Sequence, residues 1–485
     1  MGFAPLTPFS SPRTGSLRVA THAGALLALW VASSACGDDD GTTRPDAGPS
    51  IPRLTAEPLP AYEGQRRYVG VITGSVELAG ASVVVADPSV RVLEQRCAAT
   101  ACAVVLEVDD TTMNEGLVVP RPIRSRTVPI QAQRDGQTVG ELALPVFFLD
   151  ALRLEGEDEI SGSFVASSLE MPPGNRRPGR PGVEPFRVFV LGATTLRGEL
   201  AFGADEMAPR GGGTGGGADG RDGEGTGAGR AATGAGGGGG GGHATAGADG
   251  TGDGAGRGGA VRRDLDCLSS ITATGCGGAG GAGAMPGVGG AGGGALFVAS
   301  LAPIDAAGLV VDVHGAPGVD GGGGGAGGFA WLAAPAITGG PTVRGAGGTG
   351  GSSGGGEGGR GWARFDGALD VAATLDGAEP MTGPSIAMDT PSIVMSGSID
   401  LRGRGEPGRE VVLSLPAASI SAPVADDGTW TATLSLAPGL NRIRVEQRVE
   451  GQIERGWSGT SYEFDSTGHP IGAFHDIVSL GTGSP

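Results

Sequence analysis

Apolar and polar residues alternate along several stretches of the chain, and a period of two is typical of strands with one buried face. Within residues 53–150, alternation over 102–108 and over 142–148 predicts two strands. Asp135-Gly136 separates two further alternating runs and predicts a tight hairpin, because glycine accepts the positive φ that the turn requires. We therefore expect residues 53–150 to form a small β-sandwich.

A second alternating region lies near the C-terminal end of the chain. Residues 429–436 alternate between apolar side chains and Thr or Ser, and Ile443 and Val445 alternate with arginines. A short turn separates the two runs, so we expect two adjacent strands with one solvent-exposed face. This pattern predicts a second sandwich over residues 384–465, followed by a tail over 466–485.

Glycine replaces the alternating pattern in the middle of the chain, where residues 203–361 contain 62 of the 98 glycines. Three segments, 291–299, 326–334 and 357–365, each join a glycine run to a short apolar island. One such unit cannot bury its apolar side chains alone, whereas stacked copies can. We therefore expect a glycine-rich region over 151–383, part of which is β-solenoid-like.

The solenoid-like part should begin at residue 287, and its core should be filled by the islands and by the strand-like stretches that follow them. Residues 211–259 contain no apolar island, so we expect this segment to be a disordered arm. The residues expected to point inward are Phe297, Val298, Leu309, Val311, Val313, Trp331, Leu332, Ile337, Val343, Trp362 and Phe365.

The composition fits an all-β chain with many turns, because aromatic residues make up only 4% and glycine supplies 98 of the 485 residues. The formal net charge is −18, and the chain contains arginine but no lysine. An acidic chain lacks the phosphate-neutralising surface on which nucleic-acid affinity depends. The absence of lysine also excludes a Walker-type phosphate loop. We expect no nucleic-acid partner.

The N-terminal residues have the basic, apolar and small-residue order of an export signal. Arg13 and Arg18 precede an apolar run over 23–32, which is shorter than the about 20 residues that a membrane-spanning helix needs. The small residues that end at Cys36 resemble the lipobox of bacterial lipoproteins, although Ser33 occupies the place where that family usually has leucine. Ordinary secretory cleavage before the cysteine is the alternative.

The lipoprotein resemblance implies a signal peptide over 1–35, acylation of Cys36, and an acidic tether over 36–52 that holds the folded part away from a membrane. Gly37 follows the cysteine at the place where inner-membrane members of that family often have aspartate. The resemblance therefore implies an outer-membrane or cell-surface location, with the N-terminal lipid as the contact with the membrane.

Four further cysteines form two local pairs in the sequence, Cys97 with Cys102 and Cys267 with Cys276. An exported chain meets an oxidising environment, where disulfides are the usual state. Four cysteines allow three pairings, and we favour the two local ones because closing a short loop loses little chain entropy. A zinc site is the alternative, but the two spacings differ and no histidine adjoins them.

The sequence contains few patterns that indicate catalysis or metal binding. The run 350–354 matches the nucleophile pattern GxSxG, but a glycine tract produces this match without the strand-to-helix context that the chemistry requires. The acidic glycine stretches 217–224 and 247–254 leave calcium as the one cofactor to consider, yet they lack the large apolar residues of calcium-binding repeats. We expect no catalytic residue, metal site or cofactor. The nearest candidates for catalysis in the repeats are Asp312, His314 and Arg344.

Two longer patterns resemble bacterial surface proteins. The run 237–243, followed by 292–303 with 308–315 and then by 324–335, is similar to glycine-rich surface lipoproteins of myxobacterial type. Residues 427–445 fit the pattern DGTWxxxxxLxxGxNxIxV and resemble the bacterial Ig-like modules of secreted enzymes and adhesins. These resemblances imply a cell-surface role and transfer no active site.

The sandwich over 53–150 is also expected to be Ig-like, so the sequence predicts an all-β protein with two Ig-like domains flanking a glycine-rich repeat region. We expect a lipid-anchored, non-catalytic surface protein with a structural or adhesive role, whose partner is an extracellular glycan, matrix or protein. A passive surface spacer without a ligand and a β-helical polysaccharide-active enzyme are the alternatives.

Overall fold

The structure, a computed structural model, describes residues 51–109, 125–205, 208–225, 227–263, 276–284, 286–464 and 470–481. These residues form strands and turns and contain no helix, so the chain is all-β, as the sequence predicts. Accordingly, no described helix is long and apolar enough to cross a membrane. The expected signal peptide, Cys36 and most of the tether lie outside the described residues.

The N-terminal region consists of two four-stranded sheets with a shared apolar core that includes Ile72, Leu106 and Leu144. The hairpin between β7 and β8 turns at Asp135 and Gly136, with φ of 51° and 76°, which confirms the predicted turn. One sheet holds β1 (Thr55–Glu57), β3 (Tyr68–Thr73), β6 (Ala101–Val108) and β5 (Val90–Ala98). The other holds β2 (Ala61–Tyr62), β8 (Gln137–Phe147), β7 (Ser125–Arg134) and β4 (Ser82–Val85).

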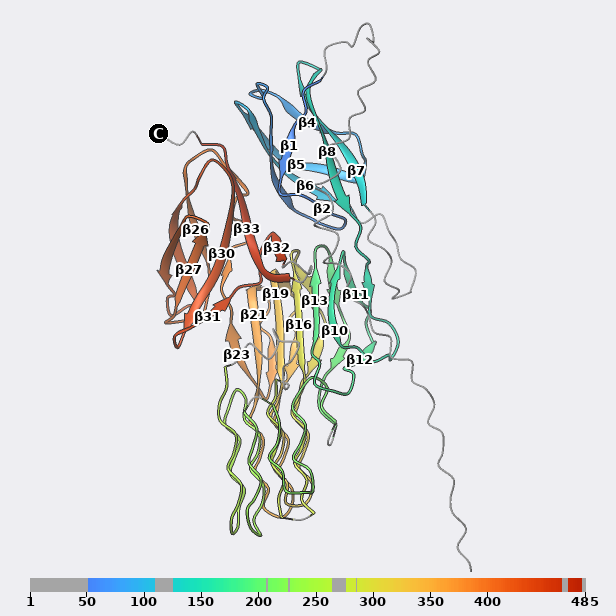
Figure 1. The fold of residues 1–485 in the computed structure, drawn as a ribbon, viewed down its shortest axis with the longest axis vertical. Coiled ribbons are helices and arrows are strands. Elements are labelled where there is room, and N and C mark those ends of the chain that lie inside the picture. The colour runs from blue at the N-terminus through green and yellow to red at the C-terminus, as the bar shows by residue number, and fades with distance from the viewer. Residues whose placement is uncertain are drawn as a thin grey trace, which may run out of the picture.

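The middle of the chain winds into coils, and strands of successive coils pair in parallel and in register. Most coils contribute to both a large sheet and a small one (Figure 1). The large sheet holds β9 (Leu152–Arg153), β10 (Gly162–Ala166), β11 (Leu169–Met171), β13 (Phe186–Val190), β14 (Thr194–Leu196), β16 (Ala295–Ser300), β17 (Ile304–Asp305), β19 (Phe329–Thr338), β21 (Gly361–Leu369) and β23 (Ala378–Thr382). The small sheet holds β12 (Arg176–Pro178), β15 (Glu199–Ala201), β18 (Val310–Asp312), β20 (Thr342–Arg344) and β22 (Thr374–Asp376).

The core of the coiled region contains side chains from both of these sheets. Of the residues expected to point inward, Phe297, Trp331 and Trp362 belong instead to a separate apolar cluster on the outer face of the large sheet. Successive residues of a strand point to opposite faces, so Phe297 and Val298 cannot both be inward. The expected residues that do line the core are Val298, Leu309, Val311, Val313, Leu332, Ile337, Val343 and Phe365.

Three glycine-rich connections leave the coils, over 202–294 between β15 and β16, 313–328 between β18 and β19, and 345–360 between β20 and β21. Figure 1 shows them as long loops that run away from the strands and lie side by side. Backbone hydrogen bonds join their described residues at regular intervals. The prediction that residues 211–259 form a disordered arm is therefore wrong for the described residues. Glycine segments can satisfy one another's backbone groups without an apolar core.

The C-terminal region has a three-stranded and a seven-stranded sheet around a core that includes Leu401, Trp430 and Ile443. The expected tail over 466–485 is wrong where the structure describes it, because β33 (Pro470–Ser479) lies between two strands of the larger sheet. The smaller sheet holds β24 (Ser385–Ile386), β26 (Ser398–Arg404) and β29 (Thr429–Ser435). The larger holds β25 (Ile393–Val394), β33, β30 (Gly439–Val449), β27 (Glu410–Leu415) and β28 (Ala418–Pro423), with β31 (Gln452–Arg455) on β30 and β32 (Ser461–Phe464) on β33.

The C-terminal region packs against both of the others. Phe189, on the outer face of the large parallel sheet, lies 5.2 Å from Trp457 and 5.9 Å from Tyr462 between ring centroids. A separate apolar cluster joins Val71 of the N-terminal region to Val478 of β33. The three regions thus form one packed unit, from which the glycine loops project (Figure 1).

Candidate functional site: the glycine bundle

The glycine-rich connections associate through hydrogen bonds between neighbouring segments. Gly213 and Gly216 donate backbone hydrogen bonds of 2.9 and 3.0 Å to the carbonyl oxygens of Gly277 and Gly280. Bonds to one neighbour therefore recur at every third residue, which is the period of the polyproline II conformation, whose backbone groups all point outward. We call the described residues within 211–263, 276–294, 313–328 and 345–360 the glycine bundle.

Residues 237–242 form the central segment of the glycine bundle. Their N–H groups donate to carbonyl oxygens of three neighbouring segments, 227–230, 248–251 and 321–324. Each neighbouring segment accepts from two residues of the central segment that are three positions apart. Carbonyl oxygens of the central segment accept hydrogen bonds from three further segments. The donors are the N–H groups of Gly256 and Gly259, of Gly281, and of Gly356 and Gly359. The central segment is thus surrounded by backbone, and all of its N–H groups and the carbonyl groups of residues 237–241 are paired without side chains.

The central segment has no room for a side chain. A Cβ atom added at Gly240 would lie 1.9 Å from the carbonyl oxygen of Glu357, and one at Gly241 would lie 1.9 Å from that of Gly278. At each of the six central positions the nearest backbone oxygen lies within 2.3 Å of the added atom. Glycine is therefore required here for close approach of backbones, and the unbroken run 237–242 is the sequence signal of this position.

Some residues other than glycine lie on the outer faces of the glycine bundle, whereas Ala279, Ala282 and Ala326 are fully buried within it. Glu357 and Arg360 are three residues apart and exposed, as are Ala346 and Thr349 on a neighbouring segment. A three-residue period places such positions on one side of a polyproline II segment. Apolar islands do not reveal these positions, because the signal is the three-residue spacing of single side chains among glycines.

Turns at the far end of the glycine bundle hydrogen-bond to one another (Figure 1). The Ser353 N–H donates to the Asp320 carbonyl over 3.0 Å, and the Gly236 N–H donates to the Asp253 carbonyl over 2.8 Å. Ser352 and Ser353 are exposed. This end of the molecule presents small and polar residues on a framework of linked turns.

The acidic stretches considered for calcium have partners within the glycine bundle. Asp219 lies 2.6 Å from Arg221, and Asp222 lies 2.6 Å from Arg230. Asp249 accepts a backbone hydrogen bond of 2.6 Å. Among the residues that the structure describes, no group of three or more His, Cys, Asp or Glu side chains is arranged to hold a metal ion.

The three candidates for catalysis gather on the small parallel sheet and its continuation. His314 Nδ1 lies 2.6 Å from Asp312 Oδ1, and Arg344 is in register with Asp312 on the next strand. The hydrogen bond to Asp312 raises the pKa of His314. Burial acts to raise the pKa of Asp312, but the hydrogen bond from His314 and the charge of Arg344 outweigh burial and lower it. The geometry therefore forms an Asp–His pair beside a cation.

The GxSxG match over 350–354 lies in a turn of the glycine bundle. A nucleophile elbow joins a strand to a helix. The described part of the chain contains no helix, so this match lacks the structural context that would make it catalytic.

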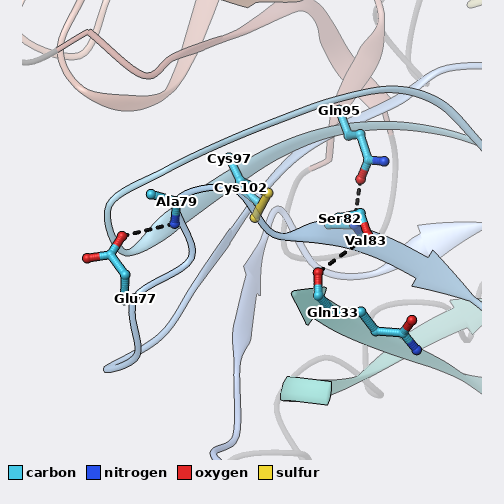
Figure 2. Close-up of a disulfide and its surroundings, with 8 residues drawn as sticks. All are labelled: Glu77, Ala79, Ser82, Val83, Gln95, Cys97, Cys102 and Gln133. Atoms are coloured by element: carbon cyan, nitrogen blue, oxygen red, sulfur yellow. Dashed lines mark hydrogen bonds between the residues drawn. A yellow bond between two sulfur atoms is a disulfide. The ribbon is translucent and has the colours of Figure 1, made fainter. Parts of the chain in front are cut away.

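Of the cysteines that the structure describes, Cys97 and Cys102 lie in the N-terminal region and Cys276 begins a described segment of the glycine bundle. Cys97 and Cys102 form a disulfide between β5 and β6, the local pairing that the sequence favours (Figure 2). Near the disulfide, Gln95 accepts a hydrogen bond from the Val83 N–H and thereby links β5 to β4 of the other sheet. Cys276 is also disulfide-bonded, while Cys267, its expected partner, lies outside the described residues.

A buried ionic network fastens the C-terminal region to the coils and to the glycine bundle. Arg364 is fully buried and donates to Asp366 over 2.7 Å and to Glu454 over 3.3 Å. Its guanidinium carbon lies 4.0 Å from the ring centroid of Trp331. Arg263, which ends one segment of the bundle, donates to Glu454 over 2.7 Å. Because each charge in this network has an opposite partner, burial is tolerated.

The glycine bundle offers shape and exposed side chains, and the Asp312–His314–Arg344 group lies where the bundle meets the small parallel sheet. The bundle projects from the packed unit of the three regions, which makes it accessible to large partners (Figure 1). Comparisons of the chain with protein-family models, with curated proteins and with solved structures found no match.

Proposed function

We propose that the chain is a lipid-anchored, non-catalytic surface protein that presents the glycine bundle for structural or adhesive contact with an extracellular glycan, matrix or protein. The observation that carries this proposal is the central segment 237–242, which is surrounded by backbone and hydrogen-bonded to it. Such packing makes a rigid projection from segments that would otherwise be flexible. A rigid projection with side chains on its outer faces is suited to contact with large partners.

The finer architecture belongs to the same proposal. We interpret the in-register parallel coils as a β-solenoid, since each coil pairs only with its neighbours. We interpret the N-terminal and C-terminal regions as Ig-like sandwiches, since each has two sheets around one core. In this arrangement the solenoid is the base of the glycine bundle, and the C-terminal sandwich covers one outer face of the solenoid.

The lipid anchor rests on the lipobox-like sequence that ends at Cys36. Labelling cells with a palmitate analogue tests it directly. Wild type should be labelled and Cys36→Ala should not, and unlabelled wild type would contradict lipidation. Protease treatment of intact cells should cleave the wild type if the protein faces outward.

The adhesive role is tested with beads that carry purified protein and are presented to cells and to a glycan array. Wild-type beads should bind. Gly240→Val, which places a side chain in the central segment, should lower binding, whereas Ala260→Val, at an exposed position, should leave binding unchanged. Equal binding by Gly240→Val would argue against the glycine bundle as the contact surface, and absence of binding by wild type would favour a passive spacer.

A polysaccharide-active enzyme is the second candidate function. It is favoured by one observation, the 2.6 Å contact between His314 and Asp312 beside Arg344. Incubation with acidic polysaccharides, followed by size analysis of the products, tests it. Degradation that is lost in His314→Gln would replace the adhesive proposal with the enzyme.

A further inference from the structure

A cleft of about 540 Å³ lies where the three regions of the chain meet. The N-terminal region lines it with Arg66, Arg67 and Leu93, the coils with Leu301 and Pro303 among others, and the C-terminal region with Ile386, Met388 and His475 among others. Pockets of roughly 300–1,000 Å³ at domain interfaces are the usual sites of small ligands. The size and place of the cleft are therefore those of a ligand site.

His475 forms part of the wall of this cleft. Its side chain comes from β33 and is only 7% exposed, and its Nε2 atom has no hydrogen-bond partner among the described residues. Burial, together with the charge of Arg67, lowers the pKa of His475 to about 4, so the ring is neutral near pH 7. Its Nε2 atom is enclosed by protein atoms and is not accessible from the cleft, so the ring forms a neutral part of the wall.

Arg67 supplies the unmatched charge. Its Nε donates to Ser392 Oγ over 2.9 Å, while its two Nη groups make no hydrogen bond with the described residues. The other charged side chains of the cleft have partners. Arg66 donates to Glu107 over 2.6 Å, and Asp305 accepts from Arg197 over 3.1 Å. The cleft thus retains one free guanidinium fork, the group best suited to bind a carboxylate.

The rest of the wall is mainly apolar. Leu301 and Ile386 are buried in it, and at its rim Leu93 and Met388 keep 52% and 57% of their surface exposed. The two rim side chains come from different regions of the chain. An apolar ligand body between them would cover both side chains and remove apolar surface from water.

We propose that this cleft binds a small organic anion, whose carboxylate contacts Arg67 and whose apolar body lies against Leu301, Ile386, Leu93 and Met388. Because these residues belong to all three regions, such a ligand would also hold the regions together. The proposal is independent of the glycine bundle and of its adhesive role.

Ligand-detected NMR with the full-length protein tests the proposal, with hexanoate as the probe and hexanamide as its uncharged match. Hexanoate should bind saturably with millimolar affinity, as expected for a fragment of this size, and hexanamide should bind at least about tenfold more weakly. Arg67→Gln should weaken hexanoate binding by about tenfold, and Arg67→Lys should retain part of it. Arg91→Gln, an exposed arginine outside the cleft, is the matched control and should bind as wild type does.

The thermal unfolding of each variant is recorded alongside, so that a loss of binding is attributed to the site only when the variant is folded. If Arg67→Gln fails to fold, Leu93→Glu takes its place, because a carboxylate at this exposed rim position should repel hexanoate and weaken its binding. Absence of saturable hexanoate binding, equal affinity for hexanamide, or unchanged binding by folded Arg67→Gln would each overturn the proposal.

Discussion

The packing of the glycine bundle makes a sharp prediction for Gly240→Ala. The new Cβ would lie 1.9 Å from the carbonyl oxygen of Glu357, and ordinary contact begins at 3.4 Å, so the two segments must separate by about 1.5 Å. Two hydrogen bonds join these segments directly, from Gly356 to Gly238 over 2.9 Å and from Gly359 to Gly241 over 2.7 Å. A separation of this size removes both bonds.

The magnitude follows from the cost of leaving buried backbone groups unpaired. Each lost bond costs about 1–3 kcal/mol, and alanine returns about 0.4–1 kcal/mol by restricting the unfolded chain. We expect a net local destabilisation of about 3 kcal/mol. Since about 1.4 kcal/mol corresponds to a factor of ten, amide exchange across the central segment should become on the order of a hundredfold faster.

Hydrogen exchange followed by mass spectrometry measures this effect on peptides that cover 237–242 and 355–360. Thr349→Ala, at an exposed position of a neighbouring segment, is the matched control and should change local stability by less than about 0.5 kcal/mol. Wild-type-like exchange in Gly240→Ala would refute the close packing of the bundle. Fast exchange of 237–242 in the wild type would refute it as well.

Three other changes have expected outcomes. Arg364→Met leaves the buried Asp366 without a cationic partner and removes one of the two arginines that pair with Glu454, so it should lower the free energy of unfolding by about 3–5 kcal/mol in urea titrations. Loss of the exposed Arg402 pair should cost less than about 1 kcal/mol, and equal effects would contradict the buried network. The pKa of His475 falls from 6.5 to about 4 on folding, so the unfolded state binds the proton first and stability is lost as pH falls from 6.5 towards 4. His475→Gln should therefore shrink the wild-type stability difference between pH 7 and pH 4.5 by about 2 kcal/mol, and an unchanged difference would show that the ring is accessible to protons. Replacing both Cys97 and Cys102 by alanine should cost about 2 kcal/mol, because the disulfide closes a short loop, and a protein of undiminished stability would contradict this assignment.

The strands that could be predicted from the sequence are those with one buried face. Residues 429–435 alternate clearly and form β29. β33 escaped prediction because both of its faces are covered. Ile477 packs in the C-terminal core, whereas the adjacent Val478 packs against the N-terminal region, so the strand shows no alternation.

Exposed loops and tertiary sites were harder to predict. Residues 172–182 are rich in proline and arginine, a composition typical of an exposed loop, yet β12 lies within them and Arg177 is largely buried. The register of parallel coils places Arg344 beside Asp312, and this register depends on connection lengths that the sequence pattern does not define. The cleft could not be predicted at all, since its walls come from three regions that are distant in sequence.

The glycine bundle shows where hydrophobic reasoning fails. Its order comes from backbone hydrogen bonds between segments and from the absence of side chains at 237–242, so a search for apolar islands classifies it as disordered. Runs of glycine flanked by single side chains three residues apart are the pattern that would have indicated it.

The central functional claim is that the far end of the glycine bundle is displayed outside the cell. Labelling intact cells with a membrane-impermeant maleimide tests it, using Ser352→Cys in an exposed turn of that end and Ala333→Cys at a fully buried position as the control. The proposal predicts that Ser352→Cys is labelled on intact cells and Ala333→Cys is not. Labelling of Ser352→Cys only after the cells are lysed would contradict it.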